Sequence, residues 1–116
     1  MLIVKHLQIR RSASEALYET VVVREDGEEL FLTATPLAGE GLAPLMARVG
    51  RRLRQLQWRA VGMTVFTGAA GSERREELLR AAFGAVEWPV TWLQSDDDSC
   101  DGPAGVEVHA VSGPEV

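Results

Sequence analysis

A glutamate near the end of the chain has the setting that best suits proton chemistry. Glu107 lies in the stretch 105–111, where apolar and other residues alternate with period two, as they also do in 87–93. This alternation is typical of β-strands that bury one face. We therefore expect Glu107 on a rigid strand, beside the strand that carries Thr91. A carboxylate held in this way can act as a general acid or base at a cleft, or it can simply face water.

Two loops resemble ligand-binding motifs only in part. Residues 68–72 (GAAGS) lead from an expected strand into an expected helix, where backbone N–H groups can hold an anion, but they lack the Lys-Ser/Thr ending of a P-loop. Capping of the helix by Ser72 explains this pattern by itself. The acidic run 96–102 begins like an EF-hand calcium loop, yet Val108 occupies the closing position and the flanks read as strands. We interpret this run as a solvated loop and expect no metal site.

The histidines and the cysteine are weaker candidates for chemistry. His6 and His109 lie on expected strands without a nearby cysteine or second histidine to complete a metal site. The chain has no G-x-S-x-G elbow for a Ser-His-Asp set. Cys100 lies among carboxylates, which disfavour the reactive thiolate. The three tryptophans are most simply anchors of the core or of an interface: Trp58, Trp88 and Trp92.

Size and composition limit the class of protein. A chain of 116 residues with 46% hydrophobic and 25% charged residues is typical of one globular domain, so we expect residues 1–116 to form a single domain. The net charge of -5 argues against nucleic acid as a partner. One cysteine suits a reducing compartment, and we see neither a signal peptide nor a membrane span. The expected location is the cytoplasm, without a membrane partner.

The rest of the pattern predicts the strands around Glu107. Six segments read as strands: 2–9, 18–24, 29–35, 60–67, 87–93 and 105–111. The Asp26-Gly27 pair between the second and third is the strongest short signal for a hairpin, so we expect these two strands to be antiparallel. Residues 10–14 (RRSAS) read as a polar connector.

Two segments show the period of an α-helix. In 42–56, apolar residues recur at three- and four-residue steps, and we interpret the opposite, arginine-rich face as solvated: Arg48, Arg51, Arg52 and Arg54. Gly50 within this helix costs about 1 kcal/mol relative to Ala, which we attribute to close packing against the sheet. A second helix runs from Ser72 to Gly84. The order β-β-β-α-β-α-β-β predicts an α+β fold, a mixed sheet with both helices on one face.

Several strings, taken in order, resemble the reactive-intermediate-deaminase (Rid) family, also called YjgF or L-PSP proteins. The similarity runs from Tyr18 to Val111, and 29–36 (ELFLTATP) takes the place of the family's hydrophobic strand ending in Ser-Gly-Gln. Three further strings match: 61–67 (VGMTVFT) against V-V-K-T-T-V-F, 88–91 (WPVT) against F-P-A-R, and 106–111 (VEVHAV) against I-E-I-E-A-I-A. Their order and spacing together carry the resemblance.

The resemblance implies a chorismate-mutase-like fold and a homotrimer with clefts at the subunit interfaces. Members of the family hydrolyse imines or enamines such as 2-aminoacrylate to ketones and ammonia, without a cofactor. Glu107 matches the glutamate that orients or activates water, whereas Thr91 stands where an arginine grips the substrate carboxylate. Threonine carries no charge and cannot form the two parallel hydrogen bonds that an arginine makes to a carboxylate. An α-imino acid should therefore be a poor substrate unless an arginine of a neighbouring subunit substitutes. The arginines considered for this role are Arg10, Arg11 and Arg24.

We therefore expect a Rid-like homotrimer whose clefts bind a small-molecule ligand. The expected lining is Tyr18, Thr35, Thr91 and Trp92 for substrate binding, with Glu107 as the catalytic residue. One hypothesis is a hydrolase or deaminase-like enzyme of a specialised pathway, acting on an imine, enamine or carbonyl intermediate less anionic than 2-aminoacrylate. The alternative is a trimer that binds a ligand or partner without catalysis.

Overall fold

A computed structural model describes residues 8–25, 27–68, 74–94 and 103–112. The strand expected at 2–9 falls almost wholly outside these residues. His6, Ser72 and the acidic run with Cys100 also lie outside them, so those interpretations stay predictions.

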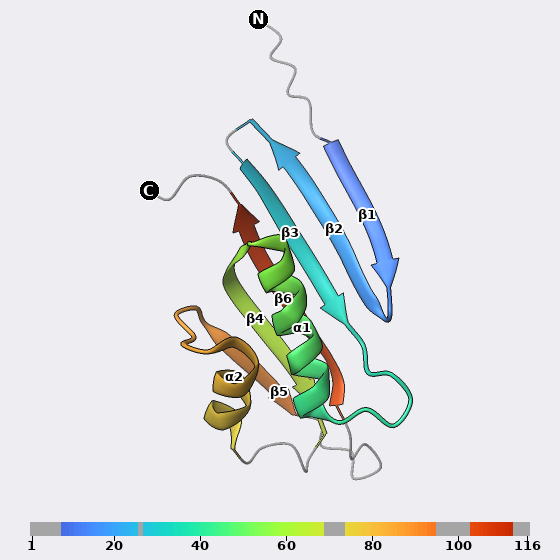
Figure 1. The fold of residues 1–116 in the computed structure, drawn as a ribbon, viewed down its shortest axis with the longest axis vertical. Helices are drawn as coiled ribbons and strands as arrows, with labels where there is room; N and C mark the ends of the chain where they lie inside the picture. Colours follow the sequence, from blue (N-terminus) through green and yellow to red (C-terminus); the bar gives the residue numbers. More distant parts are fainter. Residues whose placement is uncertain (1–7, 26, 69–73, 95–102, 113–116) are drawn as a thin grey trace, which may run out of the picture.

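The described strands form one six-stranded sheet, in which the strand order is β1-β2-β3-β6-β4-β5 (Figure 1). The strands are β1 (Gln8–Ser14), β2 (Leu17–Arg24), β3 (Gly27–Ala34), β4 (Arg59–Thr67), β5 (Val90–Gln94) and β6 (Pro103–Ser112). Neighbours are antiparallel except β4 and β5, which are parallel. The helices α1 (Leu42–Leu56) and α2 (Arg75–Phe83) lie on one face of this sheet (Figure 1). The predicted α+β class, element order and mixed sheet are confirmed.

The first hairpin differs from the prediction. Residues 10–14, interpreted as a connector, belong to β1, which pairs with β2 through the register Ser14 to Leu17. The two residues between them, Glu15 and Ala16, have φ angles of 51° and 58°. Two consecutive left-handed residues are the geometry of a type I′ turn, which normally carries Asn or Gly. The absence of such residues is why sequence reasoning missed this hairpin.

The core lies between the helices and one face of the sheet. Every second residue of the central strands is buried there: Leu30, Leu32, Ala34, Met63, Val65, Val106, Val108 and Ala110. Helix α1 adds buried Leu45, Met46 and Val49, in line with its predicted apolar stripe. The three tryptophans pack against this core as expected. Gly84 ends α2 with a φ angle of 74°, and its N–H donates to the carbonyl of Arg80.

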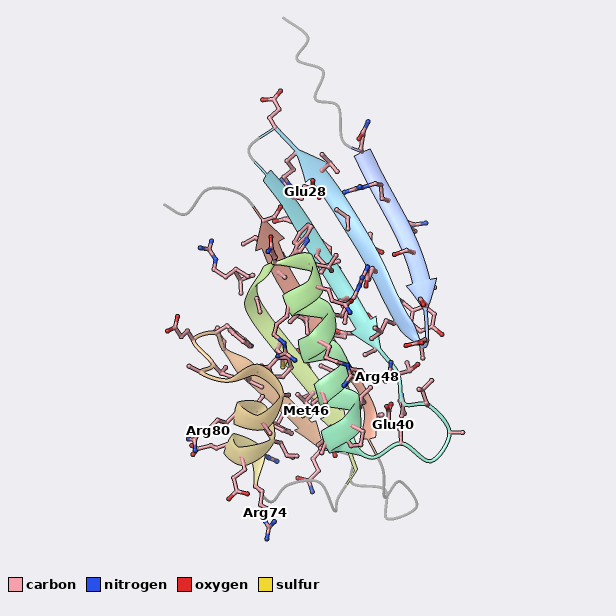
Figure 2. The ribbon with its side chains drawn as sticks, viewed as in Figure 1. Glu28, Glu40, Met46, Arg48, Arg74 and Arg80 are labelled. Carbon is pink, nitrogen blue, oxygen red and sulfur yellow. The ribbon has the colours of Figure 1, made fainter. Side chains whose placement is uncertain are left out.

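Two predictions about α1 are wrong in part. Arg48 is buried rather than solvated, because its guanidinium forms an ion pair with Glu40 at 2.8 Å (Figure 2). Gly50 packs closely, but against α2 rather than the sheet. A Cβ atom at Gly50 would lie 2.2 Å from the carbonyl oxygen of Ala82.

The strand order also corrects the expected neighbours of Glu107. Its strand, β6, lies between β3 and β4, so β4 separates it from the strand of Thr91. A register shift between Ala60 and Gly62 inserts Val61 as a bulge. Val61 is therefore 37% exposed, although Met63, two residues further along the same strand, is buried.

Candidate functional site

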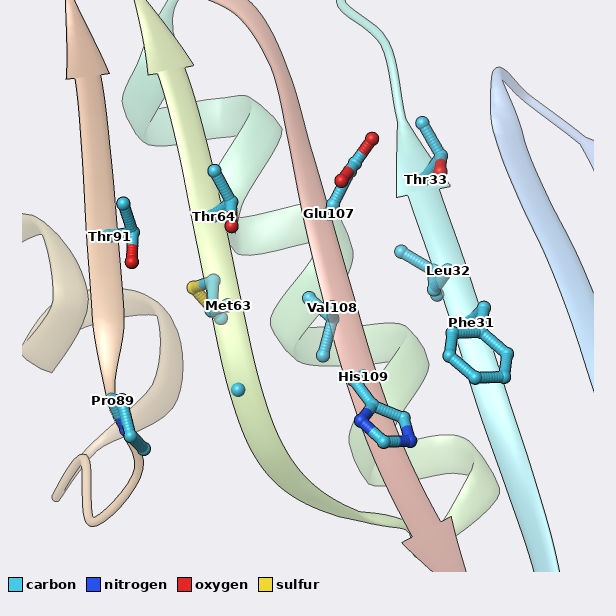
Figure 3. Close-up of a pocket in the computed structure, with 11 residues that line it drawn as sticks. Phe31, Leu32, Thr33, Met63, Thr64, Pro89, Thr91, Glu107, Val108 and His109 are labelled. Atoms are coloured by element: carbon cyan, nitrogen blue, oxygen red, sulfur yellow. The ribbon is translucent and has the colours of Figure 1, made fainter.

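Glu107 lies in a straight row of side chains on the sheet face that no described helix covers. The register pairs Glu107 with Thr33 of β3 on one side and Thr64 of β4 on the other. Thr33 pairs in turn with Tyr18, and Thr64 with Thr91. Directly opposed residues of a sheet point to the same face. We call this set, Tyr18, Thr33, Glu107, Thr64 and Thr91, the Glu107 row; Figure 3 shows four of its members at one level.

The middle of the Glu107 row lines a hollow of about 480 Å³. Thr33, Glu107, Thr64 and Thr91 supply hydroxyl and carboxylate groups, and the flanking wall includes Phe31, Pro89 and His109 (Figure 3). Among the described residues, no lysine or arginine lines this hollow. Its chemistry is therefore that of one acid, one imidazole, several neutral donors and apolar surface.

The carboxylate of Glu107 is accessible. Its side chain is exposed, and it forms no hydrogen bond or ion pair with any other residue in the described part of the chain. All its lone pairs are thus available to water or to a ligand. A carboxylate in this condition can accept a proton from a water molecule or from an acidic C–H or N–H group.

His109 also faces the hollow, which sequence reasoning missed. Its ring stacks on Phe31, with centroids 4.7 Å apart and planes 5° from parallel. Its Nε2 atom is buried without a hydrogen-bond partner in the described chain and lies 3.7 Å from Oε1 of Glu29. The signal was available, because residues two apart on a strand share a face, and His109 follows Glu107 by two.

The structure does not bring all the predicted residues together. Tyr18 ends the Glu107 row, 50% exposed and outside the hollow. Thr35 follows β3, and its backbone donates to Ala16 and accepts from Arg48. Trp92 lies on the helix-covered side, where the guanidinium of Arg75 sits 5.0 Å from the centre of its ring. Only Thr91 joins Glu107 in the hollow.

Two of the three arginines considered as substitutes for the missing charge form ion pairs within the chain. Arg10 is paired with Glu28 at 2.9 Å, and Arg24 with Glu29 at 3.0 Å.

Within the described ranges, no three His, Cys, Asp or Glu side chains gather as metal ligands do. None of the described helices has the length and apolar character needed to cross a bilayer.

Comparisons with known proteins show the fold. No protein-family model matches the chain, and no curated protein matches it in sequence. A solved structure from Salmonella typhimurium, described as "a putative translation initiation inhibitor", superposes with a TM-score of 0.66 and 17% identity over 92% of this chain and 100% of its own. That description is typical of the YjgF/Rid family. The six-stranded mixed sheet with two helices matches the YjgF-like fold.

Proposed function

We propose that this chain is a divergent Rid-like protein that hydrolyses a small, uncharged imine or enamine, or acts on the related carbonyl compound. The observation that carries the proposal is the Glu107 row, in which an accessible carboxylate stands among threonine hydroxyls above a hollow of about 480 Å³. In this function, Glu107 removes a proton from the attacking water. The threonines orient the water and the polar end of the substrate by hydrogen bonds.

The lack of a lysine or arginine among the described residues of the hollow limits the class of substrate. With Thr91 at the place of the family arginine, a substrate carboxylate would meet Glu107, the imidazole of His109 and neutral groups, and no guanidinium to bind it. Two like charges in one site repel each other, and a desolvated carboxylate without a partner is costly. We therefore favour a substrate without a carboxylate over 2-aminoacrylate.

The uncovered sheet face supports assembly into a trimer, with each hollow completed by a neighbouring subunit. This face exposes large apolar side chains: Ile9, Tyr18, Phe31 and Leu93. Exposed apolar groups gathered on one face mark interaction surfaces more often than scattered ones do. A second copy of the same chain would bury them and shield the hollow from bulk solvent.

A second candidate function is binding without catalysis. The specific observation in its favour is that Glu107 is exposed and unpaired in the described part of the chain. An exposed acid without a partner among the described residues is what a glutamate with a purely surface role would show. The description of the Salmonella protein concerns translation initiation, but a net charge of -5 gives RNA binding no support.

Turnover of two probes tests the proposal. Ammonia release from freshly generated 2-aminoacrylate measures ordinary Rid activity, and the absorbance decay of N-benzylidenemethylamine measures hydrolysis of an uncharged imine. We expect the wild type to accelerate the second reaction more than the first. Thr91→Arg, which restores a cation at the row, should raise the rate with 2-aminoacrylate.

Glu107→Gln separates catalysis from binding. We expect it to lower kcat/KM for the uncharged imine by on the order of 10²-fold or more, since it removes the base. Glu28→Gln is the matched control, because Glu28 belongs to the same sheet but pairs with Arg10 away from the hollow. Unchanged turnover by Glu107→Gln, or no acceleration of either probe by the wild type, would favour the binding function.

A further inference from the structure

His109 and Glu107 form a pair of proton-handling groups on one wall of the hollow. Both belong to β6, two residues apart, and both line the hollow (Figure 3). Such residues lie roughly 7 Å apart along a strand. This spacing is large enough for the reacting atoms of a small molecule to lie between a carboxylate and an imidazole.

The imidazole is held from two sides. Phe31, directly opposite on β3, stacks on its ring and fixes the ring plane. Glu29, two residues earlier on the same strand, directs Oε1 toward Nε2 at 3.7 Å, and its other oxygen accepts from Arg24 at 3.0 Å. Because Nε2 is buried and turned to Glu29, Nδ1 is the ring nitrogen left to serve a molecule in the hollow. At this distance the carboxylate of Glu29 attracts the protonated ring by charge rather than by a hydrogen bond, and so favours the orientation that turns Nε2 toward it.

We propose that His109 is a second catalytic residue, which donates a proton to the imine nitrogen while Glu107 takes one from water, and that Glu29 is its positioning residue. This inference rests on the proposed function, since it needs a reaction in the hollow. It deepens that function by adding a group that the resemblance does not supply, where the family string has a glutamate.

The proton transfers balance. In the first step, a water oxygen bonds to the imine carbon, Glu107 takes the water proton, and the C=N electron pair moves to nitrogen, which takes a proton from the imidazolium of His109. In the second step the roles reverse. The C–N bond breaks as Glu107 returns its proton to the departing amine, and His109 takes the proton of the hydroxyl group. The products are a carbonyl compound and an amine or ammonia, and both side chains are restored.

The wall next to His109 indicates the substrate class. The Phe31 ring is 45% exposed and lines the hollow beside the imidazole. A flat, apolar substituent can pack on this surface, whereas a carboxylate would lie near Glu107 and gain no cation other than the imidazolium itself. The geometry therefore favours uncharged imines with a flat apolar substituent, such as those of aromatic aldehydes.

The charged groups around His109 define the pH dependence. From β3 it faces Glu29, which is paired with Arg24 of β2, and on its own strand it neighbours Glu107. On β4, Gly62 lies opposite His109. Arg59 lies opposite Val111, which is two residues beyond His109 on β6. If the imidazolium donates the proton, kcat/KM should rise as pH falls toward its protonated form, until Glu107 loses its charge.

The test uses N-benzylidenemethylamine as probe and follows kcat and KM across pH. His109→Gln should lower kcat/KM on the order of 10²-fold and remove the rise at lower pH. His109→Phe keeps a flat ring against Phe31 and should show the same loss, so it also serves if His109→Gln folds poorly. Glu29→Gln should lower kcat more than KM, whereas Glu28→Gln on the opposite face leaves both unchanged.

The outcomes separate the two proposals. A loss in Glu107→Gln together with losses in both His109 variants supports the inference. A loss in Glu107→Gln with wild-type rates and pH profile in His109→Gln and His109→Phe overturns the role of His109 and leaves the proposed function standing. Wild-type rates in Glu107→Gln, or no turnover by the wild type, overturn the proposed function and the inference with it.

Discussion

Replacement of Arg48 by methionine is the perturbation for which the structure gives the sharpest expectation. The guanidinium donates to both carboxylate oxygens of Glu40 at 2.8 Å, to the carbonyl of Glu15 at 2.6 Å and to that of Thr35 at 2.9 Å. The side chains of the pair are only 8% and 9% exposed. Methionine keeps the apolar stem but removes all four hydrogen bonds, leaving a buried carboxylate without its partner cation.

The expected loss of stability follows from the buried carboxylate of Glu40, which loses its partner cation. Breaking a buried ion pair by removing one partner costs about 3–5 kcal/mol. Glu40 keeps one donor, the N–H of Leu37 at 3.1 Å, which argues for the lower end. We expect Arg48→Met to lower the free energy of unfolding by about 3 kcal/mol, and Tm by on the order of 10 °C for a domain of this size.

The pH dependence has a definite sign. Hydrogen bonds from Arg48 hold the pKa of Glu40 below its ordinary value, against the opposing effect of burial. A carboxyl whose pKa is lowered in the folded state adds stability above its unfolded pKa of about 4.3 and loses it as pH falls through the lower folded value. The difference in the free energy of unfolding between the wild type and Arg48→Met should therefore have its largest value at pH 7 and become smaller below about pH 4.

Urea denaturation followed by circular dichroism measures these differences. Arg51→Met is the control, since Arg51 is an exposed arginine of the same helix, and we expect it to stay within about 0.5 kcal/mol of the wild type. The double variant Arg48→Met with Glu40→Gln should be more stable than Arg48→Met alone, because the orphaned charge is gone. An Arg48→Met protein within 1 kcal/mol of the wild type at pH 7 would refute the reasoning.

Two further predictions concern packing and assembly. Gly50→Ala should destabilise the fold by about 1–3 kcal/mol despite the better helix propensity of alanine, since the new Cβ meets the Ala82 carbonyl at 2.2 Å; a stabilised variant in thermal unfolding would contradict this contact. Light scattering should give the mass of three chains, with Phe31→Glu on the uncovered face lowering it and Arg80→Glu on exposed α2 leaving it unchanged; a monomeric wild type would rule out the assembly.

The elements that sequence reasoning predicted well are those with local signals. Periodicity gave α1 its bounds at Leu42 and Leu56, and the Asp-Gly pair identified the β2–β3 hairpin. The environment of Arg48 could not be read in this way. On the helix it belongs to the polar face, and its burial depends on Glu40, which lies before the helix and joins it only in the folded chain.

The candidate site was predicted in part for the same reason. Glu107 and Thr91 were singled out from local strings, but the insertion of β6 between β3 and β4 is a long-range pairing that no short window encodes. This insertion brings Thr33 and Thr64 beside Glu107 and Phe31 beside His109. Trp92, expected to line the site, lies on the other face of β5 from Thr91, because successive residues of a strand point to opposite faces.

The turn between β1 and β2 is supported from far along the chain. Glu15 and Ala16 both adopt left-handed backbone angles that cost a non-glycine residue roughly 1–2 kcal/mol each. Their carbonyls are held by Arg48 of α1 and by the N–H of Thr35. The bend is thus supported by an arginine of α1 that lies 33 positions beyond Glu15 in the sequence. Loss of Arg48 would therefore remove a support of the β1–β2 turn as well as the partner cation of Glu40.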